Sequence, residues 1–306
     1  MSHWANLGET TFVAGIRVLF WIWRWFGRLP FRLVLVPVVV VHWATNRVAR
    51  HASADYLRRW RLLGVGPGGG SVAVVKHFLS FGETILDKLV SFSGHYPYGL
   101  MEFQNVEMMI ERIQSGRGGI IVTSHVGCLE LCQVASGRRS GFRMTVLTHT
   151  RHAERFNRLL SRVANGASEG IRLLQVTELG PSIAETLKSR VDAGEFIAIA
   201  GDRVPVGPST RTLEIPFLGE PAVFPQGPYL LALLMRCPVF MMTCMRQRSG
   251  RHRVSFDLIA DLSAVPRDRR GTAISAAASR FVSLLEDKLR ETPLEWFNFF
   301  PFWRRP

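Results

Sequence analysis

Gly119-Ile-Ile-Val-Thr-Ser124 is a short apolar run rich in β-branched residues, and the stretch after it, Val126 to Ala135, has the composition of a helix. The same alternation of a strand-like run and a helical stretch recurs at Met144 to Leu147, Ile171 to Leu174 and Phe196 to Ala200. Short apolar strands separated by helical stretches indicate an α/β protein, with a central mixed sheet flanked by helices.

Helical spacing of apolar residues is visible on both sides of these strands. It runs through Val75 to Ser93, and a shorter helical run covers Val106 to Ile113. Thr272 to Glu291 predicts a helix that stops before Pro293. Its apolar face consists of Ile274, Phe281, Leu284, Leu285 and Leu289.

The N-terminal part, from Phe12 to Ala44, is strongly apolar and aromatic, but four arginines interrupt it. Its arginine-free apolar stretch, Leu33 to Ala44, contains Pro37 and is shorter than the roughly 20 residues that a spanning helix needs. Arginines within the apolar part also argue against a secretory signal. Three interpretations stay open: a kinked or tilted span with snorkelling arginines, a pair of amphipathic helices in the membrane interface, and a buried helical hairpin. Interleaved tryptophans and arginines favour the headgroup region of a membrane.

Five arginines follow the apolar part directly: Arg47, Arg50, Arg58, Arg59 and Arg61. By the positive-inside rule they place the main domain in the cytosol, so the expected location is the cytoplasmic face of a membrane. A glycine-rich break from Gly64 to Gly70 spells G-x-G-x-x-G, but no strand precedes it, so we interpret it as a linker. The predicted organisation is therefore a membrane-anchoring helical segment over residues 1–63 and an α/β domain over residues 71–306.

The chain is strongly basic, because 38 lysines and arginines face 24 acidic residues and give a formal net charge of +14. Nucleic acid, anionic lipid headgroups and acidic carrier proteins are all attracted to such a surface. A nucleic-acid binder would not need the apolar N-terminus, and no basic-aromatic recognition motif is present, so we expect no nucleic acid partner. The four cysteines lack the spacing of a disulfide framework, which fits a reducing, cytosol-facing location.

His125 follows a predicted strand directly, at the edge where α/β proteins usually carry reactive groups, and Glu130 lies five residues further on. In one continuous helix this spacing would set the two side chains about 140° apart. If His125 instead precedes the helix, Glu130 can turn back and accept a hydrogen bond from the imidazole, as the orienting carboxylate of a general base does. The spacing alone also fits a helix-capping histidine beside an unrelated surface glutamate.

Four blocks of the chain resemble a known family. His125-Val-Gly-Cys-Leu-Glu130 matches the H-x4-D/E motif of the lysophospholipid acyltransferase superfamily, and more closely its branch of bacterial lipid A late acyltransferases. Phe196 to Arg203 resembles the second block of the superfamily, a strand that ends in an Asp-Arg pair. The other similar blocks are Ile215 to Gly219 with Ala222 to Ala232 and Cys237 to Val239, and the aromatic tail Glu295 to Trp303. With the apolar N-terminus, the resemblance covers nearly the whole length.

The resemblance implies transfer of a fatty acyl group from a thioester of acyl carrier protein or coenzyme A. The acceptor would be a hydroxyl or amine of a membrane lipid or glycolipid, at an anionic membrane surface, with no covalent acyl-enzyme, cofactor or metal. His125 would deprotonate the acceptor, and Glu130 would hold His125 and balance its charge. The residues that it assigns to substrate binding are Asp202, Arg203, Arg151, Asn157, Phe224, Gly227 and Trp296.

Some of these assignments have alternatives. Arg203 suits an anionic acceptor or the phosphate of a pantetheine arm, but an Asp202–Arg203 pair that only fixes a loop fits as well. The basic stretch Arg151 to Arg158 would dock a carrier protein or a headgroup, or be a solvated face. Cys128 and Cys132 are four residues apart beside His125, and two thiols with one histidine fall one ligand short of a metal site, so the cysteines are interpreted as buried hydrophobes. A nucleophilic role for Cys128 is opposed by the family pattern.

The sequence also departs from the family pattern. The second block contains Gly-Asp-Arg rather than an Asp-Gln pair, and the tail contains Trp-Phe-Asn-Phe-Phe rather than a tryptophan followed by basic residues. These differences resemble a divergent acyltransferase subgroup and put lipid A itself in doubt as the acceptor. A catalytically inactive membrane scaffold or lipid-binding protein of the same fold is the alternative function.

Overall fold

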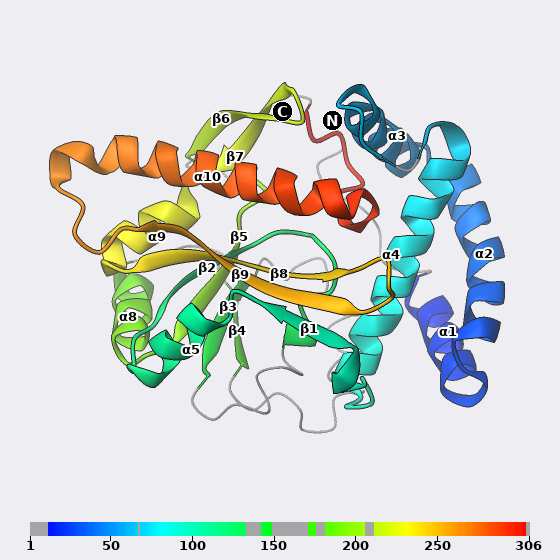
Figure 1. Cartoon of the computed structure of the whole chain (residues 1–306), viewed down its shortest axis with the longest axis horizontal. Helices are drawn as coiled ribbons and strands as arrows, with labels where there is room; N and C mark the ends of the chain where they lie inside the picture. The colour runs from blue at the N-terminus through cyan, green and yellow to red at the C-terminus, as the bar shows by residue number, and fades with distance from the viewer. Residues whose placement is uncertain are drawn as a thin grey trace.

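The computed structural model describes residues 12–66, 68–132, 142–148, 171–175, 181–205 and 211–303 (Figure 1). Its helices are α1 (Phe12–Phe26), α2 (Arg28–Thr45), α3 (Arg47–Leu62), α4 (Gly70–Phe92), α5 (Glu107–Gln114), α8 (Pro181–Asp192), α9 (Gly227–Met235) and α10 (Arg270–Glu291). Its strands are β1 (Met101–Gln104), β2 (Gly119–Thr123), β3 (Met144–Thr148), β4 (Ile171–Gln175), β5 (Phe196–Ala200), β6 (Thr212–Phe217), β7 (Glu220–Pro225), β8 (Pro238–Arg246) and β9 (His252–Asp261).

Seven strands form one mixed sheet in the order β1-β9-β8-β2-β5-β3-β4, and β6 and β7 form a separate antiparallel hairpin. Within the large sheet β8 and β9 are antiparallel, and the other neighbouring pairs are parallel. The α/β class, the central mixed sheet and the strands at β2, β3, β4 and β5 are confirmed. The central strands are apolar on both faces because helices and loops cover both sides of the sheet, so β2 and most of β8 are buried.

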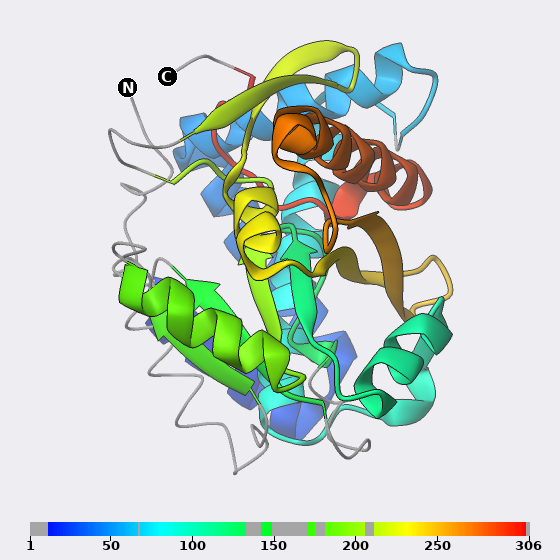
Figure 2. The ribbon, with the colours of Figure 1, turned by 90° about the vertical axis from the view of Figure 1, so that its left-hand side faces the viewer.

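Helices enclose this sheet on its long sides. α10 lies along the top of the sheet in Figure 1, with the β6–β7 hairpin beyond it, while α8 and α9 lie together at the left, where Figure 2 shows them from the front. The predicted apolar face of α10 is buried, and the predicted helices at α4 and α5 are present with boundaries shifted by a few residues. Helix α3 ends at Leu62 and α4 begins at Gly70, so the last residue of the glycine-rich break belongs to α4.

The apolar N-terminal part forms two helices, α1 and α2, which lie outside α4 (Figure 1). Phe31, Leu35 and Val39 of α2 are buried and belong to the same apolar core as the sheet residues, because they recur on the side of the helix that faces α4. In the described part of the chain, only α2 is long and apolar enough to cross a membrane by length and composition.

The predicted start of the helix after β2 is wrong. The helix expected from Val126 begins at Leu131, and the residues before it form a loop. Val126 is bridged to Trp296, and Gly127 is bridged to Cys244 of β8, so this loop pairs with segments that are distant in the sequence. Tertiary pairing has therefore replaced the first turns of the helix.

Candidate active site

The site begins where the parallel strands β2 and β5 end side by side. Thr123 is paired with Ala200, and the amide of Gly201 donates a hydrogen bond of 2.8 Å to the carbonyl oxygen of Thr123. His125 and Asp202 follow these two strand ends. Because the carboxyl ends of parallel strands meet at one edge of a sheet, the two side chains are brought together.

His125 and Asp202 form a two-point contact. The backbone amide of His125 donates to Oδ2 of Asp202 at 2.8 Å, and the ring atom Nδ1 lies 2.8 Å from Oδ1. A carboxylate can only accept, so Nδ1 carries the proton and the other ring nitrogen, Nε2, has a free lone pair. The His125 side chain is 34% exposed, whereas Asp202 is fully buried. A partly exposed imidazole thus stands in front of a buried carboxylate.

Two residues of the C-terminal tail complete the environment of Asp202. The indole Nε1 of Trp296 donates to Oδ2 at 3.1 Å, and Nδ2 of Asn298 donates to the same oxygen at 2.8 Å. Burial raises the pKa of Asp202, but the facing His125, its hydrogen bonds and Arg203 lower it far more, so the net pKa lies well below its usual range. Asp202 is therefore ionised at neutral pH.

The pKa of His125 is lowered from its usual 6.5, first by partial burial and then by the positive charge of Arg203. The charge of Asp202 and its hydrogen bond act in the opposite direction, and Lys88 adds a smaller lowering. The imidazole is therefore neutral at neutral pH, which is the state that a general base needs before reaction.

The C-terminal tail runs along the loop that carries His125. The amide of Phe297 donates a hydrogen bond to the carbonyl oxygen of His125 at 2.8 Å. The amide of Gly127 donates to the carbonyl oxygen of Glu295, also at 2.8 Å. Gly127 has a φ of +57°, and a Cβ there would lie 2.0 Å from the carbonyl oxygen of Cys244. Only glycine fits this position, where the loop is pressed against β8.

Glu130 does not take the orienting position that the sequence suggested. Its Oε1 lies 2.5 Å from Nζ of Lys88, and its backbone oxygen accepts a hydrogen bond of 2.9 Å from Oγ of Ser91, both on α4. The pKa of Glu130 is raised by burial but lowered more by Lys88, so the net pKa is below normal. The carboxylate at Nδ1 of His125 is that of Asp202, and this corrects the predicted hydrogen bond between His125 and Glu130.

Arg203 is turned towards the tail. Its Nε donates to Oδ1 of Asn298 at 2.9 Å, and its guanidinium lies 5.7 Å from the ring centroid of Phe300. Burial lowers the pKa of Arg203 to about 10, while Asp202 raises it, so the group keeps its positive charge. Its charge lies close enough to His125 to depress the pKa of the imidazole.

The remaining sequence-predicted site residues are not all brought together. Trp296 is at the site, but its side chain is buried and bonded to Asp202, which differs from the expected contact with substrate. Phe224 of β7 is buried in an aromatic cluster with Phe217, 5.7 Å away between ring centroids, and Gly227 begins α9. Arg151 and Asn157 lie outside the described residues. Sequence reasoning missed Asn298 and Lys88, for which no local motif gives a signal.

Cys128 and Cys132 are buried free thiols, and burial raises the pKa of Cys128 well above its usual value. A thiol in that state is a poor nucleophile. Within the described residues, no group of three or more His, Cys, Asp or Glu side chains is placed to hold a metal ion.

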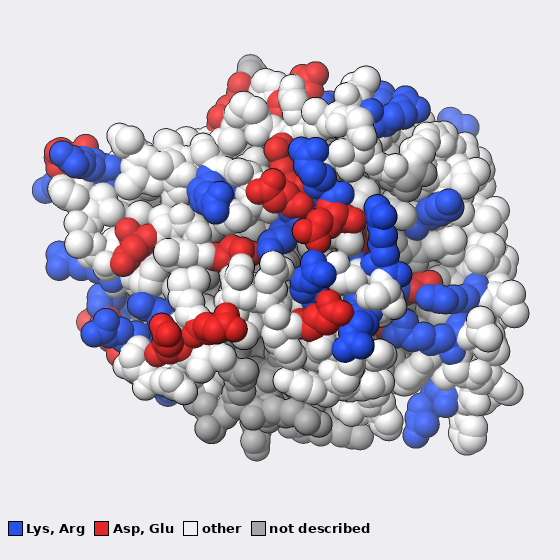
Figure 3. Space-filling model, viewed as in Figure 1, with Lys and Arg blue, Asp and Glu red and all other residues white. Residues whose placement is uncertain are grey.

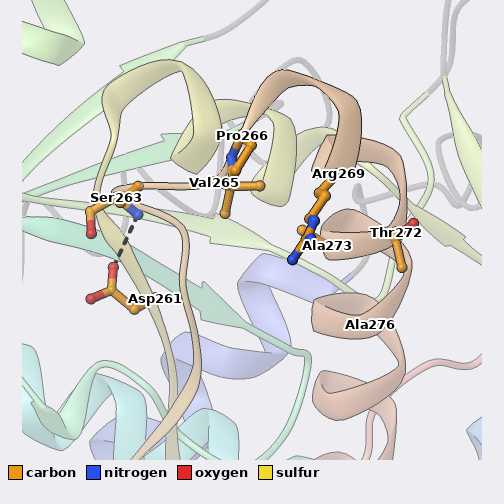
Figure 4. Close-up of a pocket in the computed structure, with 9 residues that line it drawn as sticks. Asp261, Ser263, Val265, Pro266, Arg269, Thr272, Ala273 and Ala276 are labelled. Carbon is orange, nitrogen blue, oxygen red and sulfur yellow. Dashed lines mark hydrogen bonds between the residues drawn. The ribbon is translucent and has the colours of Figure 1, made fainter.

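Two cavities lie away from His125. One, of about 680 Å³, is formed by the loop after β9 and the start of α10, where Asp261 accepts a hydrogen bond of 3.0 Å from the amide of Ser263 (Figure 4). The second, of about 520 Å³, lies between α2, α3 and the start of α4, and its lining includes Trp43 and Arg50. Neither is lined by His125 or Asp202.

The fold and the site together define an α/β protein with a partly exposed histidine held by a buried aspartate at the carboxyl edge of its sheet. The family model for bacterial lipid A biosynthesis acyltransferases matches residues 84–305, and the chain belongs to this family. This membership supports an acyltransferase that acts on lipid and confirms the resemblance to the lipid A branch. A comparison with curated proteins gave no match.

Proposed function

We propose that this protein is a membrane-associated acyltransferase that uses His125 as its general base. It moves a fatty acyl group from a thioester of acyl carrier protein or coenzyme A to a hydroxyl or amine of a lipid or glycolipid, at the cytoplasmic face of a bacterial inner membrane. The observation that carries the proposal is the His125–Asp202 pair, in which Nδ1 is fixed by a buried carboxylate and the ring is partly exposed.

The chemistry follows from this arrangement. Nε2 of His125 takes the proton of the acceptor hydroxyl or amine as the acceptor atom attacks the thioester carbonyl carbon. The tetrahedral intermediate collapses as the carbon–sulfur bond breaks, and the imidazolium returns the proton to the departing thiolate. Asp202 stabilises the imidazolium between these steps, because its negative charge is 2.8 Å from Nδ1.

Glu130 has an electrostatic role in this proposal. Lys88 lowers the pKa of His125, and the carboxylate of Glu130 lies 2.5 Å from its Nζ. Glu130 thus offsets a positive charge that would otherwise disfavour the imidazolium. Arg203 and Arg151 are assigned to the anionic parts of the substrates, and Asn157 is assigned to substrate binding.

The reaction is tested by transfer from labelled acyl carrier protein and labelled acyl coenzyme A to a total membrane lipid extract. The intact protein is compared with His125→Gln and with the matched control His95→Gln, since His95 is an exposed histidine after α4. Labelled lipid is expected with the intact protein and the control, and not with His125→Gln. Equal transfer by all three, or none from either donor by folded intact protein, would refute the proposal and favour an inactive scaffold.

The role of Glu130 is tested separately with Glu130→Gln, Lys88→Met and the double variant. If Glu130 acts by offsetting Lys88, Glu130→Gln lowers activity and the double variant recovers much of it. If Glu130 instead acts directly on substrate or on His125, removing Lys88 as well restores nothing. The double-mutant cycle separates these two roles, because Glu130 and Lys88 show a coupling energy for activity only if Glu130 acts through Lys88.

A further inference from the structure

The helical hairpin of α1 and α2 turns at Gly27, and α2 then runs antiparallel to α4 (Figure 1). Arg28 pairs with Asp87 at one end of the contact, and the ring of His42 lies 5.3 Å from that of Phe78 at the other. These contacts span 14 residues of α2, or about 21 Å at 1.5 Å per residue. α2 therefore lies along the α/β domain over most of its length.

Charged groups fix the first turns of α2 to α4. Arg32 donates from Nε and Nη2 to the two carboxylate oxygens of Glu83, at 2.8 and 3.0 Å. Arg246 of β8 pairs with both Glu83 and Asp87, and Asp87 is fully buried. These ion pairs hold α2 against α4, and they would need to break or be carried into hydrocarbon if α2 crossed a bilayer next to α4.

The opposite side of α2 is an exposed apolar stripe. Leu29 and Leu33 are 74% and 75% exposed, and Val36 and Val40 continue the stripe. At 100° per residue these four side chains fall within about 60° of one another, away from the side that packs on α4. The exposed side chains of Val34, Val38 and Val41 extend the apolar surface further around the helix. On α1, Trp21 is likewise exposed. Exposed aromatic and aliphatic side chains along one side of a helix are typical of helices that lie in a membrane–water interface.

The N-terminal helices that include this apolar stripe are rich in arginine, although Arg28 and Arg32 are paired with Asp87 and Glu83. Residues 12–66 contain nine arginines and one acidic residue, Asp55. The lining of the cavity of about 520 Å³ at the end of α2 includes four basic residues, Arg50, His51, Arg58 and Arg61, among apolar and small ones. The outer right-hand edge of Figure 3, where α2 lies, shows white and blue atoms. This combination of apolar and positive surface is complementary to anionic lipid headgroups above acyl chains.

We propose that the α1–α2 hairpin lies in the plane of an anionic bilayer surface, with its apolar stripe just below the headgroups, and that α2 does not cross the membrane. The contact along α4 and the ion pairs of Arg28 and Arg32 then stay intact at the water side of the interface. The inference rests on the membrane residence in the proposed function, but it does not depend on acyl transfer.

The test measures the depth of labels along the stripe. Leu29→Cys, Leu33→Cys and Val40→Cys each receive a thiol-reactive fluorophore, with Leu234→Cys on α9 as the matched control because Leu234 is 60% exposed on the α/β domain. The four native cysteines are buried, so unsubstituted protein gives the labelling background. Vesicles of phosphatidylethanolamine and phosphatidylglycerol carry nitroxide groups either near the headgroup or deep in the acyl chain. No acyl donor is present.

An in-plane helix predicts that the three α2 labels are quenched equally, more by the shallow nitroxide, and that the control label is not quenched. A crossing helix predicts a depth gradient, because positions 29 and 40 are about 16 Å apart along the axis. Such a gradient would overturn the inference while leaving membrane residence intact. Failure to bind these vesicles at all would overturn both. Replacing phosphatidylglycerol by phosphatidylcholine should weaken binding at least about tenfold, and unchanged binding would overturn the anionic part of the inference.

Discussion

Asp202→Asn is the substitution that most directly tests the proposed base. Oδ2 of Asp202 accepts three hydrogen bonds, from the amide of His125, the indole of Trp296 and the side chain of Asn298. The oxygen of an asparagine would keep these three bonds, so its amino group must occupy the Oδ1 position and face Nδ1 of His125. That amino group donates, which forces the imidazole proton onto Nε2.

The expected result is a loss of activity without a loss of fold. With its proton on Nε2, His125 cannot accept the proton of the acceptor, and no negative charge remains to stabilise an imidazolium. Loss of the orienting carboxylate in this way costs roughly 10³- to 10⁴-fold in kcat, or about 4 to 5.5 kcal/mol of transition-state stabilisation. Only one of four hydrogen bonds to the side chain is changed, so thermal unfolding should shift little.

The assay is the initial rate of acyl transfer at saturating donor and acceptor, with unfolding followed by circular dichroism. Asp261→Asn is the matched control. Asp261 is also at a strand end, as the last residue of β9, and it also accepts a backbone hydrogen bond, but it lines the distant cavity. Retention of more than about a tenth of the activity by folded Asp202→Asn would refute the assignment of Asp202 as the orienting group of His125.

Further variants and a pH profile test the surroundings of this pair. Trp296→Phe keeps an aromatic side chain but replaces the indole by a smaller phenyl ring and removes the donor to Asp202; the lost hydrogen bond alone should cost about 1.5 to 3 kcal/mol of unfolding free energy in a denaturant titration. Gly127→Ala should lower both stability and kcat, because its Cβ would lie 2.0 Å from a backbone oxygen of β8; wild-type values would contradict the tight loop. Cys128→Ala should retain transfer within a few-fold, and complete loss in a folded protein would revive a thiol nucleophile. The activity kcat/KM should rise with pH and level off with a midpoint below 6.5, because the neutral form of His125 is active and its pKa is lowered; a midpoint above 6.5 would contradict the electrostatics of the site.

Local patterns in the sequence were sufficient for part of the fold, and strands β1 and β6 to β9 and helices α8 and α9 were not predicted. The strands at β2, β3, β4 and β5 follow from short apolar runs, and α10 follows from its periodic apolar face. The loop at Val126 could not be predicted in this way. Its backbone pairs with Cys244 and Trp296, more than 100 residues away, and no propensity of the loop itself encodes those partners.

The site was predictable in composition but not in connectivity. His125 and Asp202 were both predicted as site residues, yet Glu130 was predicted to orient His125. Glu130 is close to His125 in the sequence, whereas the pairing of β2 with β5 cannot be seen in the sequence. Had that parallel pairing been known, the position of each residue just beyond its strand end would have placed the two side chains together. Asn298 was beyond reach, since its role depends on the path of the tail along the loop of His125.

Helix α4 links the proposed base to the α1–α2 hairpin. One side of α4 holds α2 through Glu83 and Asp87, and the next residue along the helix, Lys88, holds Glu130 beside the base. Nearer the N-terminal end of α4, Nε2 of His77 donates a hydrogen bond of 2.8 Å to the carbonyl oxygen of Trp296.

His77 is a neutral link in this arrangement, because burial lowers its pKa to about 4 and its Nδ1 accepts a hydrogen bond of 2.8 Å from Oγ of Ser53 on α3. The indole of the same Trp296 donates to Asp202. Helix α4 therefore contacts both carboxylates of the site. It reaches Asp202 through Trp296 of the tail, and it contacts Glu130 directly through Lys88. On the proposed orientation, a single rigid helix fixes the height of His125 above the lipid surface, so an acceptor hydroxyl presented at the headgroup level meets Nε2 at a defined depth.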